Sequence, residues 1–526
     1  MRARELSPFV GLLLLSSLVG CFEDPVANPT TSDAGTTGDG DGDVTDSGDG
    51  DGDPTDSGDG DGDPTDSGDG DGDPTDSGDG DGDNDSESGD GDGDPVGSAG
   101  DYLWSVSFPG FPVGIGPYGE DMLLVANLRE AWQGPDEVIV PDGSDILLLA
   151  FTAAGETPWA RAVGGPAGDF AVSAAFYGDQ RVAASAIYAG DETTYGGPTF
   201  PPGNNTSALV GFSGPQAEHA WSLPVVGNFV PGALDVDGAL NVLLTGRGIG
   251  SITLDGLSTN GAPSNQVVFG RMGTTGDNLS VTALREYGEQ MNFDEGMFAK
   301  HDGLGGIYIG GRFEGTTDLD GEQLVSEGER NAFIARVAIN GDVEWVAQIS
   351  SPENIGLAPT AMATDASGRL LVGGSFQQAI RYNGQGLGSD ASGKDAFVLR
   401  IDSQGTLSDY WLFTSPGDAD VRAIDVASNG DLLIGGEAAG GLQFGDTSLA
   451  GVGGIDAVLM RLDESGQELW SGLYGSGSDD RVNAVAFDPQ DRPFAGISYL
   501  GNLELGEGVL LENDSGEFWS ALVAFE

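Results

Sequence analysis

Residues 417–470 read GDADVRAIDVASNGDLLIGGEAAGGLQFGDTSLAGVGGIDAVLMRLDESGQELW. Short apolar runs alternate here with Gly, Asp and Asn, a composition typical of short strands joined by tight turns. One run, 431–436, ends in a Gly pair, and another, 456–461, is led by Asp-Ala. With the apolar run 421–427 before them and the strand opened by Trp470 after them, the stretch predicts four consecutive strands.

The same elements recur along the rest of the chain. The Trp that opens a strand stands at 104, 159, 221, 345, 411 and 470, and Ser280 occupies the equivalent place in a longer gap. Copies of the Asp-Ala strand lie at 331–336 and 395–400, with degenerate copies at 145–152, 206–213, 265–272 and 518–525. Seven such units predict an all-β fold, a seven-bladed β-propeller of four-stranded antiparallel blades over residues 101–526. Two smaller propellers, a β-sandwich array and a β-helix remain alternatives.

The two ends of the repeat region complement each other. It begins with an isolated Trp104 strand and ends, after 518–525, without a Trp strand. The N-terminal strand is therefore predicted to complete the last unit and close the ring. An open solenoid has no use for this offset, because it needs capping repeats at its ends.

The unit from Gly417 to Trp470 resembles the bacterial SBBP-type seven-bladed propeller repeat. That repeat reads approximately G-x-D-x-x-x-x-V-A-x-D-x-x-G-x-L-x-V-G-G-x-F, followed by D-A-F-V-x-R-x-D-x-x-G-x-x-x-W. The resemblance covers the units from about Thr282 onward, whereas the first three units depart from the pattern. It implies architecture more than chemistry, because the family shares a repeat and no catalytic residues.

The N-terminal segment is typical of an exported lipoprotein. Arg2 and Arg4 precede a short apolar core at 9–18, which predicts a signal peptide over residues 1–20. The sequence at 18–21, Leu-Val-Gly-Cys, resembles the bacterial lipobox, which implies acylation of Cys21, the only cysteine in the chain. The residue after it is Phe22 and not the Asp of inner-membrane retention, so we expect an outer-membrane lipoprotein anchored through lipid. Periplasmic and cell-surface faces both remain open.

Residues 21–100 form a low-complexity, acidic tract. DGDGDPTDSG recurs with a period of ten residues, and residues 22–100 contain 27 Asp and Glu but no Lys or Arg. With almost no apolar side chains to bury, the tract is predicted to be a disordered, extended spacer. Calcium binding is an alternative, because hard cations prefer carboxylates. An EF-hand loop starting at Asp49 fails, since Pro54 stands where Gly is needed and Gly60 where Glu is needed.

The charge balance excludes one class of partner. The whole chain carries a formal charge of −65, of which about −39 falls on residues 101–526. Such a field repels polyanions, so we expect no nucleic-acid partner. A protein or a glycan ligand remains compatible with it.

Catalytic chemistry has few candidates in this sequence. His219 and His301 are the only histidines, and both are predicted to be surface turn residues, which leaves little for a Ser-His-Asp triad or a histidine-rich metal site. Carboxylates are plentiful, and those in loops ahead of the predicted innermost strands should converge on one face, where they could bind calcium or another ligand. These candidates are Asp169, Asp294, Glu295, Asp418, Asp420, Asp479 and Asp480.

Three functions fit these observations. A non-enzymatic binding or display module on a membrane anchor is favoured, with the acidic residues as solvated loop side chains. An extracellular polysaccharide hydrolase or lyase that uses paired carboxylates, with calcium as a possible cofactor, is the alternative. The third is a purely structural envelope component.

Overall fold

The computed structural model describes residues 100–526 except 191–192, 202, 260, 285–294, 320, 329, 339, 352–356 and 507. These residues belong to one compact unit, Gly93–Glu526, and their regular structure consists of strands, which confirms the all-β prediction. In this part of the chain, no helix has the length and hydrophobicity to cross a bilayer. The signal peptide, Cys21 and the spacer lie outside the described residues.

Most strands form antiparallel groups of four in which strands that follow each other along the chain are paired. The groups are β2 (Gly110–Tyr118), β3 (Asp121–Leu128), β6 (Asp145–Phe151) and β7 (Trp159–Val163); β8 (Asp169–Phe176), β9 (Arg181–Gly190), β10 (Gly203–Ser213) and β11 (Glu218–Pro224); β12 (Val226–Val236), β13 (Val242–Leu254), β15 (Ala262–Met272) and β16 (Asn278–Leu284); β17 (Glu295–His301), β18 (Gly306–Phe313), β21 (Asn331–Ala338) and β22 (Val343–Ser350); β23 (Ala358–Thr364), β24 (Leu370–Tyr382), β25 (Gln385–Ile401) and β26 (Leu407–Phe413); β27 (Ala419–Val426), β28 (Leu432–Phe444), β29 (Thr447–Leu462) and β30 (Glu468–Tyr474); and β31 (Asp480–Phe487), β32 (Pro493–Leu500), β35 (Phe518–Phe525) and β1 (Tyr102–Phe108).

Short strands extend or decorate these groups. They are β4 (Trp132–Gln133), β5 (Val138–Ile139), β14 (Leu257–Ser258), β19 (Thr316–Leu319), β20 (Glu322–Val325), β33 (Leu503–Glu504) and β34 (Leu510–Leu511). One departure from separate four-stranded groups occurs, because β22 pairs with β24 at Ile349–Tyr382 and Ser350–Arg381 and joins two groups into one sheet. The 13-residue β24 is long enough to reach past its own group to β22.

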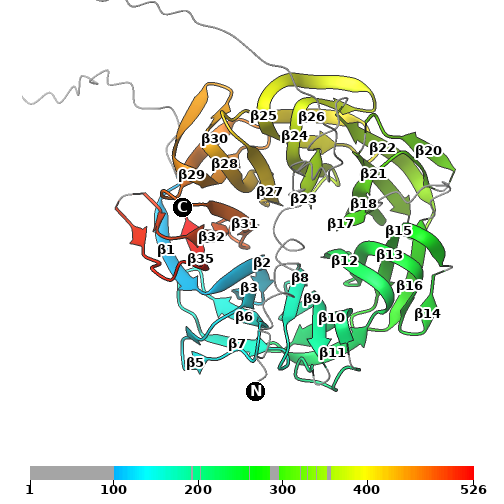
Figure 1. Ribbon diagram of the computed structural model, residues 1–526, viewed down its shortest axis with the longest axis horizontal. Helices are drawn as coiled ribbons and strands as arrows, with labels where there is room; N and C mark the ends of the chain where they lie inside the picture. Colours follow the sequence, from blue (N-terminus) through cyan, green and yellow to red (C-terminus); the bar gives the residue numbers. More distant parts are fainter. Residues whose placement is uncertain are drawn as a thin grey trace, which may run out of the picture. The chain divides into compact units, whose positions relative to one another are not determined.

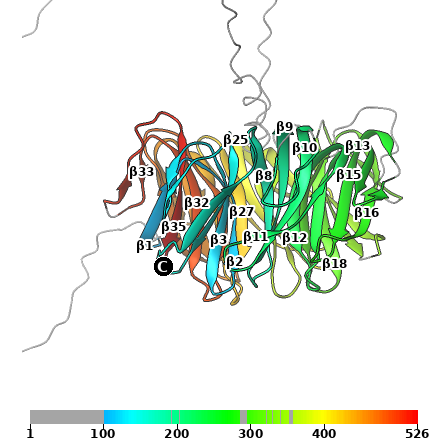
Figure 2. The same cartoon turned by 90° about the horizontal axis from the view of Figure 1, so that it is seen from below.

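The groups follow one another around a common centre (Figure 1). Their first strands, β2, β8, β12, β17, β23, β27 and β31, each contact the next along the chain, and β31 contacts β2. Seen edge-on, the strands run between two faces where the connecting loops lie (Figure 2). The loops between groups and the hairpin loops between second and third strands lie at the same face, because neighbouring strands are antiparallel.

The last group contains both ends of the described chain. β1 pairs with β35, with Ser105 opposite Val523 and Phe108 opposite Ser520. The prediction that the Trp104 strand completes the final unit is therefore confirmed. Phe108 of β1 and Phe525 of β35 are fully buried.

The recurring Gly pair permits close packing between neighbouring groups. A Cβ at Gly373 on β24 would lie 2.5 Å from Val421 Cγ1 on β27, and one at Gly310 on β18 would lie 3.1 Å from Met362 Cε on β23. Real Cβ atoms essentially never approach within 3.0 Å of another heavy atom, so a side chain at Gly373 would push the groups apart.

The recurring Trp connects each fourth strand to the next group. Trp345 on β22 packs against Tyr308 with ring centroids 5.9 Å apart and donates a hydrogen bond to the Ser403 carbonyl at 3.0 Å. Its ring lies against Gly405, which has φ +79° in the turn before β26. Trp104 is placed similarly, donating to the Ala153 carbonyl beside Gly155. The Trp repeat is therefore a contact between groups as well as a strand marker.

Candidate functional site

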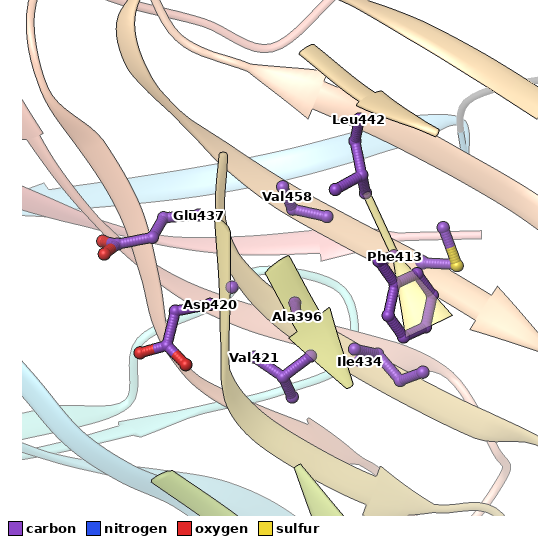
Figure 3. A pocket seen from close by; sticks show the side chains of 10 residues that line it. Ala396, Phe413, Asp420, Val421, Ile434, Glu437, Leu442 and Val458 are labelled. Atoms are coloured by element: carbon purple, nitrogen blue, oxygen red, sulfur yellow. The ribbon is translucent and has the colours of Figure 1, made fainter. Parts of the chain in front are cut away.

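Two carboxylates face each other on the inner strands β27 and β28. Asp420 and Glu437 are direct cross-strand partners, a relation that places Cβ atoms about 5 Å apart. The hydroxyl of Thr360, from β23 in the neighbouring group, donates to Asp420 Oδ1 at 3.1 Å. Figure 3 shows both carboxylates on the same side, away from the apolar side chains around them. The pair thus lies where two groups meet, close to the centre of the fold.

Two arginines surround Glu437. Arg481 Nε, from β31, lies 2.9 Å from Glu437 Oε2, and Arg422 Nη1, from β27, lies 3.5 Å from Oε1. Arg481 also reaches Asp479, with Nη2 3.7 Å from Oδ2. Glu437 therefore connects two neighbouring groups through charge. We call Asp420, Glu437, Arg422, Arg481 and Asp479 the inner-strand cluster.

The two carboxylates of the pair have different electrostatic environments. Burial raises the pKa of Asp420 to about 7; Arg422 opposes this rise, and the charge of Glu437 adds to it. Asp420 is therefore partly protonated at neutral pH. Glu437 is held by two guanidinium groups. The pair combines a buried carboxyl group with a second one that is held between two cations.

A small pocket adjoins this pair. Its volume is about 10 Å³, far below the roughly 300–1,000 Å³ of typical ligand pockets. Apart from Asp420, Glu437 and Gly436, its lining is apolar: Ala396, Phe413, Val421, Ile434, Leu442, Val458 and Met460. Such a lining has no further polar groups with which to orient a sugar.

The other predicted acidic residues do not join this cluster. Asp169 and Asp480 each begin a first strand but are fully buried, and Asp418 is exposed and accepts a hydrogen bond from Lys394 N at 3.0 Å. Asp294 lies outside the described residues, and Glu295 begins β17 but its side chain is not described. Of the seven candidates, the structure brings Asp420 and Asp479 to one cluster.

Asp169 and Asp480 are instead each placed beside a second buried aspartate. Asp145, which begins β6, lies near Asp169, and Asp456 of β29 lies near Asp480, in each case beside a shared glycine. Burial raises the pKa of both Asp169 and Asp480 to about 7, since neither forms an ion pair that would offset it. Asp145 and Asp456 recur in the sequence as leaders of the Asp-Ala strand, a marker that predicted the strand but not the pairing.

The histidine prediction is wrong in one respect. His219 lies within β11 and His301 ends β17, so both belong to strands and not to turns. His301 Nδ1 lies 2.8 Å from Asp235 Oδ2, and this contact raises the pKa of His301. Within the described residues, no three His, Cys, Asp or Glu side chains form a group suited to a metal ion. Calcium therefore stays a prediction.

No protein-family model and no curated protein matches this sequence. Solved structures give distant similarities. A protein of unknown function from Bacteroides caccae is 11% identical, covering 68% of this chain and 94% of that one, with a TM-score of 0.34. Quinohemoprotein alcohol dehydrogenase from Comamonas testosteroni is 9% identical over 80% of this chain and 76% of that one, with a TM-score of 0.35. An exotype rhamnogalacturonan lyase is 12% identical over 81% and 91%, with a TM-score of 0.28.

Proposed function

We propose that this chain is an outer-membrane lipoprotein, acylated at Cys21, whose residues 101–526 form a seven-bladed β-propeller of the SBBP-repeat type that acts as a non-enzymatic binding module. The closed cycle of contacts among the seven first strands and the pairing of β1 with β35 support the propeller. The lipobox-like sequence before Cys21 and the acidic spacer support a tethered module held away from a membrane.

The observation that carries the binding role is the inner-strand cluster. It gathers charged groups from neighbouring groups of strands near the centre of the fold, where a protein side chain or a ligand could exchange ion-pair partners with Glu437. The domain carries a formal charge of about −39, which attracts cationic surfaces and repels anionic polymers. The ligand that fits both facts is a protein with a basic segment.

The binding role is tested by presenting the acylated full-length chain to basic and neutral peptides and to a neutral glycan array at 0.15 M salt. We expect capture of basic peptides that weakens as salt rises, and a loss of about tenfold or more in Glu437→Gln. Glu504→Gln is the matched control, because it removes the same charge from an exposed position outside the cluster. Capture of a neutral glycan that does not depend on salt would show that the ligand is a glycan and not a basic protein. If none of the probes is captured, the binding role is refuted.

A polysaccharide hydrolase or lyase is the second candidate, favoured by the cross-strand pair of Asp420, whose pKa burial raises to about 7, and Glu437. Glycosidases use such a pair as acid and as base or nucleophile. The small apolar pocket argues against it, because a sugar needs more room and more polar contacts. Release of reducing ends or unsaturated sugars from a polysaccharide panel, abolished in Glu437→Gln, would establish this function in place of the first.

A further inference from the structure

A pair of buried aspartates occupies the junction between the β27–β30 group and the β31 group. Asp456 and Asp480 are both 0% exposed. Val452 N donates to Asp456 Oδ2 at 2.9 Å and Ser476 N donates to Asp480 Oδ2 at 3.0 Å. The Oδ1 atom of each aspartate is buried without a hydrogen-bond partner among the described residues. Unpaired buried carboxylate oxygens are costly, so this arrangement requires a compensating group.

Both carboxylates lie close to one glycine. A Cβ at Gly475 would lie 2.7 Å from Asp480 Oδ2 and 2.8 Å from Asp456 Oδ1, so both aspartates border the position that a side chain would fill. Gly475 itself pairs with Glu504 in an isolated bridge.

The same arrangement recurs between the β2–β7 group and the β8 group. Asp145 and Asp169 flank Gly164, and Gly164 forms the equivalent isolated bridge, with Thr194. Gly165 N donates to Asp169 Oδ2 at 2.6 Å, as Ser476 N does to Asp480. Asp145 Oδ1 is buried without a partner in the described part of the chain, and Asp145 is 7% exposed.

A third junction, between the β23–β26 group and the β27 group, provides an internal comparison. Thr414 forms the equivalent bridge, with Gln443, and the first strand begins with Ala419 in place of an aspartate. The following N–H, of Ser415, now donates to Asp395 Oδ1 at 3.0 Å. Where only one carboxylate is present, it receives that hydrogen bond and the glycine is replaced by a larger residue. The glycine and the second aspartate therefore occur together.

We propose that each aspartate pair, Asp145 with Asp169 and Asp456 with Asp480, binds one calcium ion beside its glycine. A hard cation binds oxygen ligands and completes its shell with backbone carbonyls and water, so two carboxylates with unpaired oxygens are a suitable core. This assignment is independent of the proposed binding role.

The test uses the mature full-length chain and two readouts at pH 7.5. The first is the thermal midpoint with 1 mM calcium or with chelator. The second is terbium emission sensitised by tyrosine, which reports both pairs, because the Tyr195 hydroxyl donates to Asp169 Oδ1 at 3.2 Å and Tyr499 lies near enough to Asp480 to feel its charge. The spacer has no Tyr or Trp, so counter-ions on it contribute no sensitised emission.

We expect calcium to raise the midpoint by at least about 2 °C, because it binds only the folded state. Asp480→Asn and Asp169→Asn should each lose part of that shift, and the double variant should lose all of it. Each single variant should also lose part of the terbium emission and the double variant all of it, whereas Asp395→Asn, at the unpaired junction, should keep both signals.

Three results would overturn the assignment. They are a midpoint that does not respond to calcium in the parent chain, a calcium shift of unchanged size in the double variant, and terbium emission of unchanged intensity in the double variant. Should the double variant fail to fold, Thr414→Gly with Ala419→Asp provides the converse test. It rebuilds the pair at the third junction and should enlarge the calcium shift; an unchanged shift would count against the proposal.

Discussion

Asp480→Asn should make the stability of the domain less dependent on pH. The pKa of Asp480 is raised from 3.8 to about 7 in the folded state by burial. A carboxyl with a raised folded pKa stabilises the fold while it is protonated, and this contribution is lost as pH rises from about 4 through about 7. Three pKa units correspond to roughly 4 kcal/mol at about 1.4 kcal/mol per unit, an upper limit for one group.

Asparagine cannot ionise, so the variant avoids the cost of ionising a buried side chain. Its amide, however, lacks hydrogen-bond partners at this position, which costs about 1–3 kcal/mol of stability. The parent loses about 1.6 kcal/mol of this contribution between pH 3.8 and pH 5, at about 1.4 kcal/mol per pH unit. In the presence of a chelator, the variant should therefore be less stable than the parent by about 1–3 kcal/mol below about pH 4, and within about 1.5 kcal/mol of it at pH 5. Above pH 8 it should be equally stable or more stable. The two stability curves should cross.

The assay is urea unfolding followed by tryptophan fluorescence, in chelator, at pH values between 5 and 8. Asp463→Asn is a control of opposite sign, because hydrogen bonds from Ser465 and Gln467 lower the pKa of Asp463. Its stabilising contribution is lost as pH falls, so that variant should differ most from the parent at neutral pH. If the curves of the parent and Asp480→Asn stay parallel from pH 5 to 8, the explanation of the Asp480 environment is wrong.

Three other perturbations test separate parts of the structure. Trp345→Ala removes the ring contact with Tyr308 and the hydrogen bond to the next group, and should lower the free energy of unfolding by about 3–5 kcal/mol in urea titrations; a loss below about 1 kcal/mol would contradict the role of the Trp repeat. Deletion of residues 101–108 exposes the edge of β35 and should cause concentration-dependent light scattering, which a monomeric deletion variant would disprove. Cys21→Ser should abolish palmitate labelling and move the chain from the membrane fraction to the soluble fraction; continued membrane retention would exclude the lipid anchor.

Much of the fold could be predicted because its determinants are local and repeated. The Gly pair, the Asp-Ala strand and the Trp each recur at fixed places, so the strands and the β1–β35 pairing followed from spacing. The pairing between β22 and β24 could not, because it depends on how far one hairpin extends past its neighbours. Sequence spacing carries no information on that reach.

The candidate site was less predictable. The sequence criterion selected acidic residues in loops, and it therefore missed charged residues that lie inside strands. Arg422 and Arg481 stand among apolar residues of inner strands, where polar alternation was the signal that these positions face the centre. Glu437 directly follows a Gly pair, which was interpreted as the end of a strand, so Glu437 was not selected as a site residue. Asp169 and Asp480 were identified by position, but burial depends on the partners Asp145 and Asp456, which lie 24 residues earlier in each case.

The two aspartate pairs lie on either side of the position where the ends of the described chain close the cycle of strand groups. The group that contains β1 and β35 is held together by pairing between distant ends of the described chain, whereas the other groups are continuous. One pair lies where this group meets the β27–β30 group, and the other lies where the neighbouring β2–β7 group meets β8. The pairs thus flank the two groups between which the cycle would open if β1 separated from β35. A cation at each pair would fix both of these groups to their outer neighbours, so calcium would oppose opening at the point where chain connectivity alone resists it least.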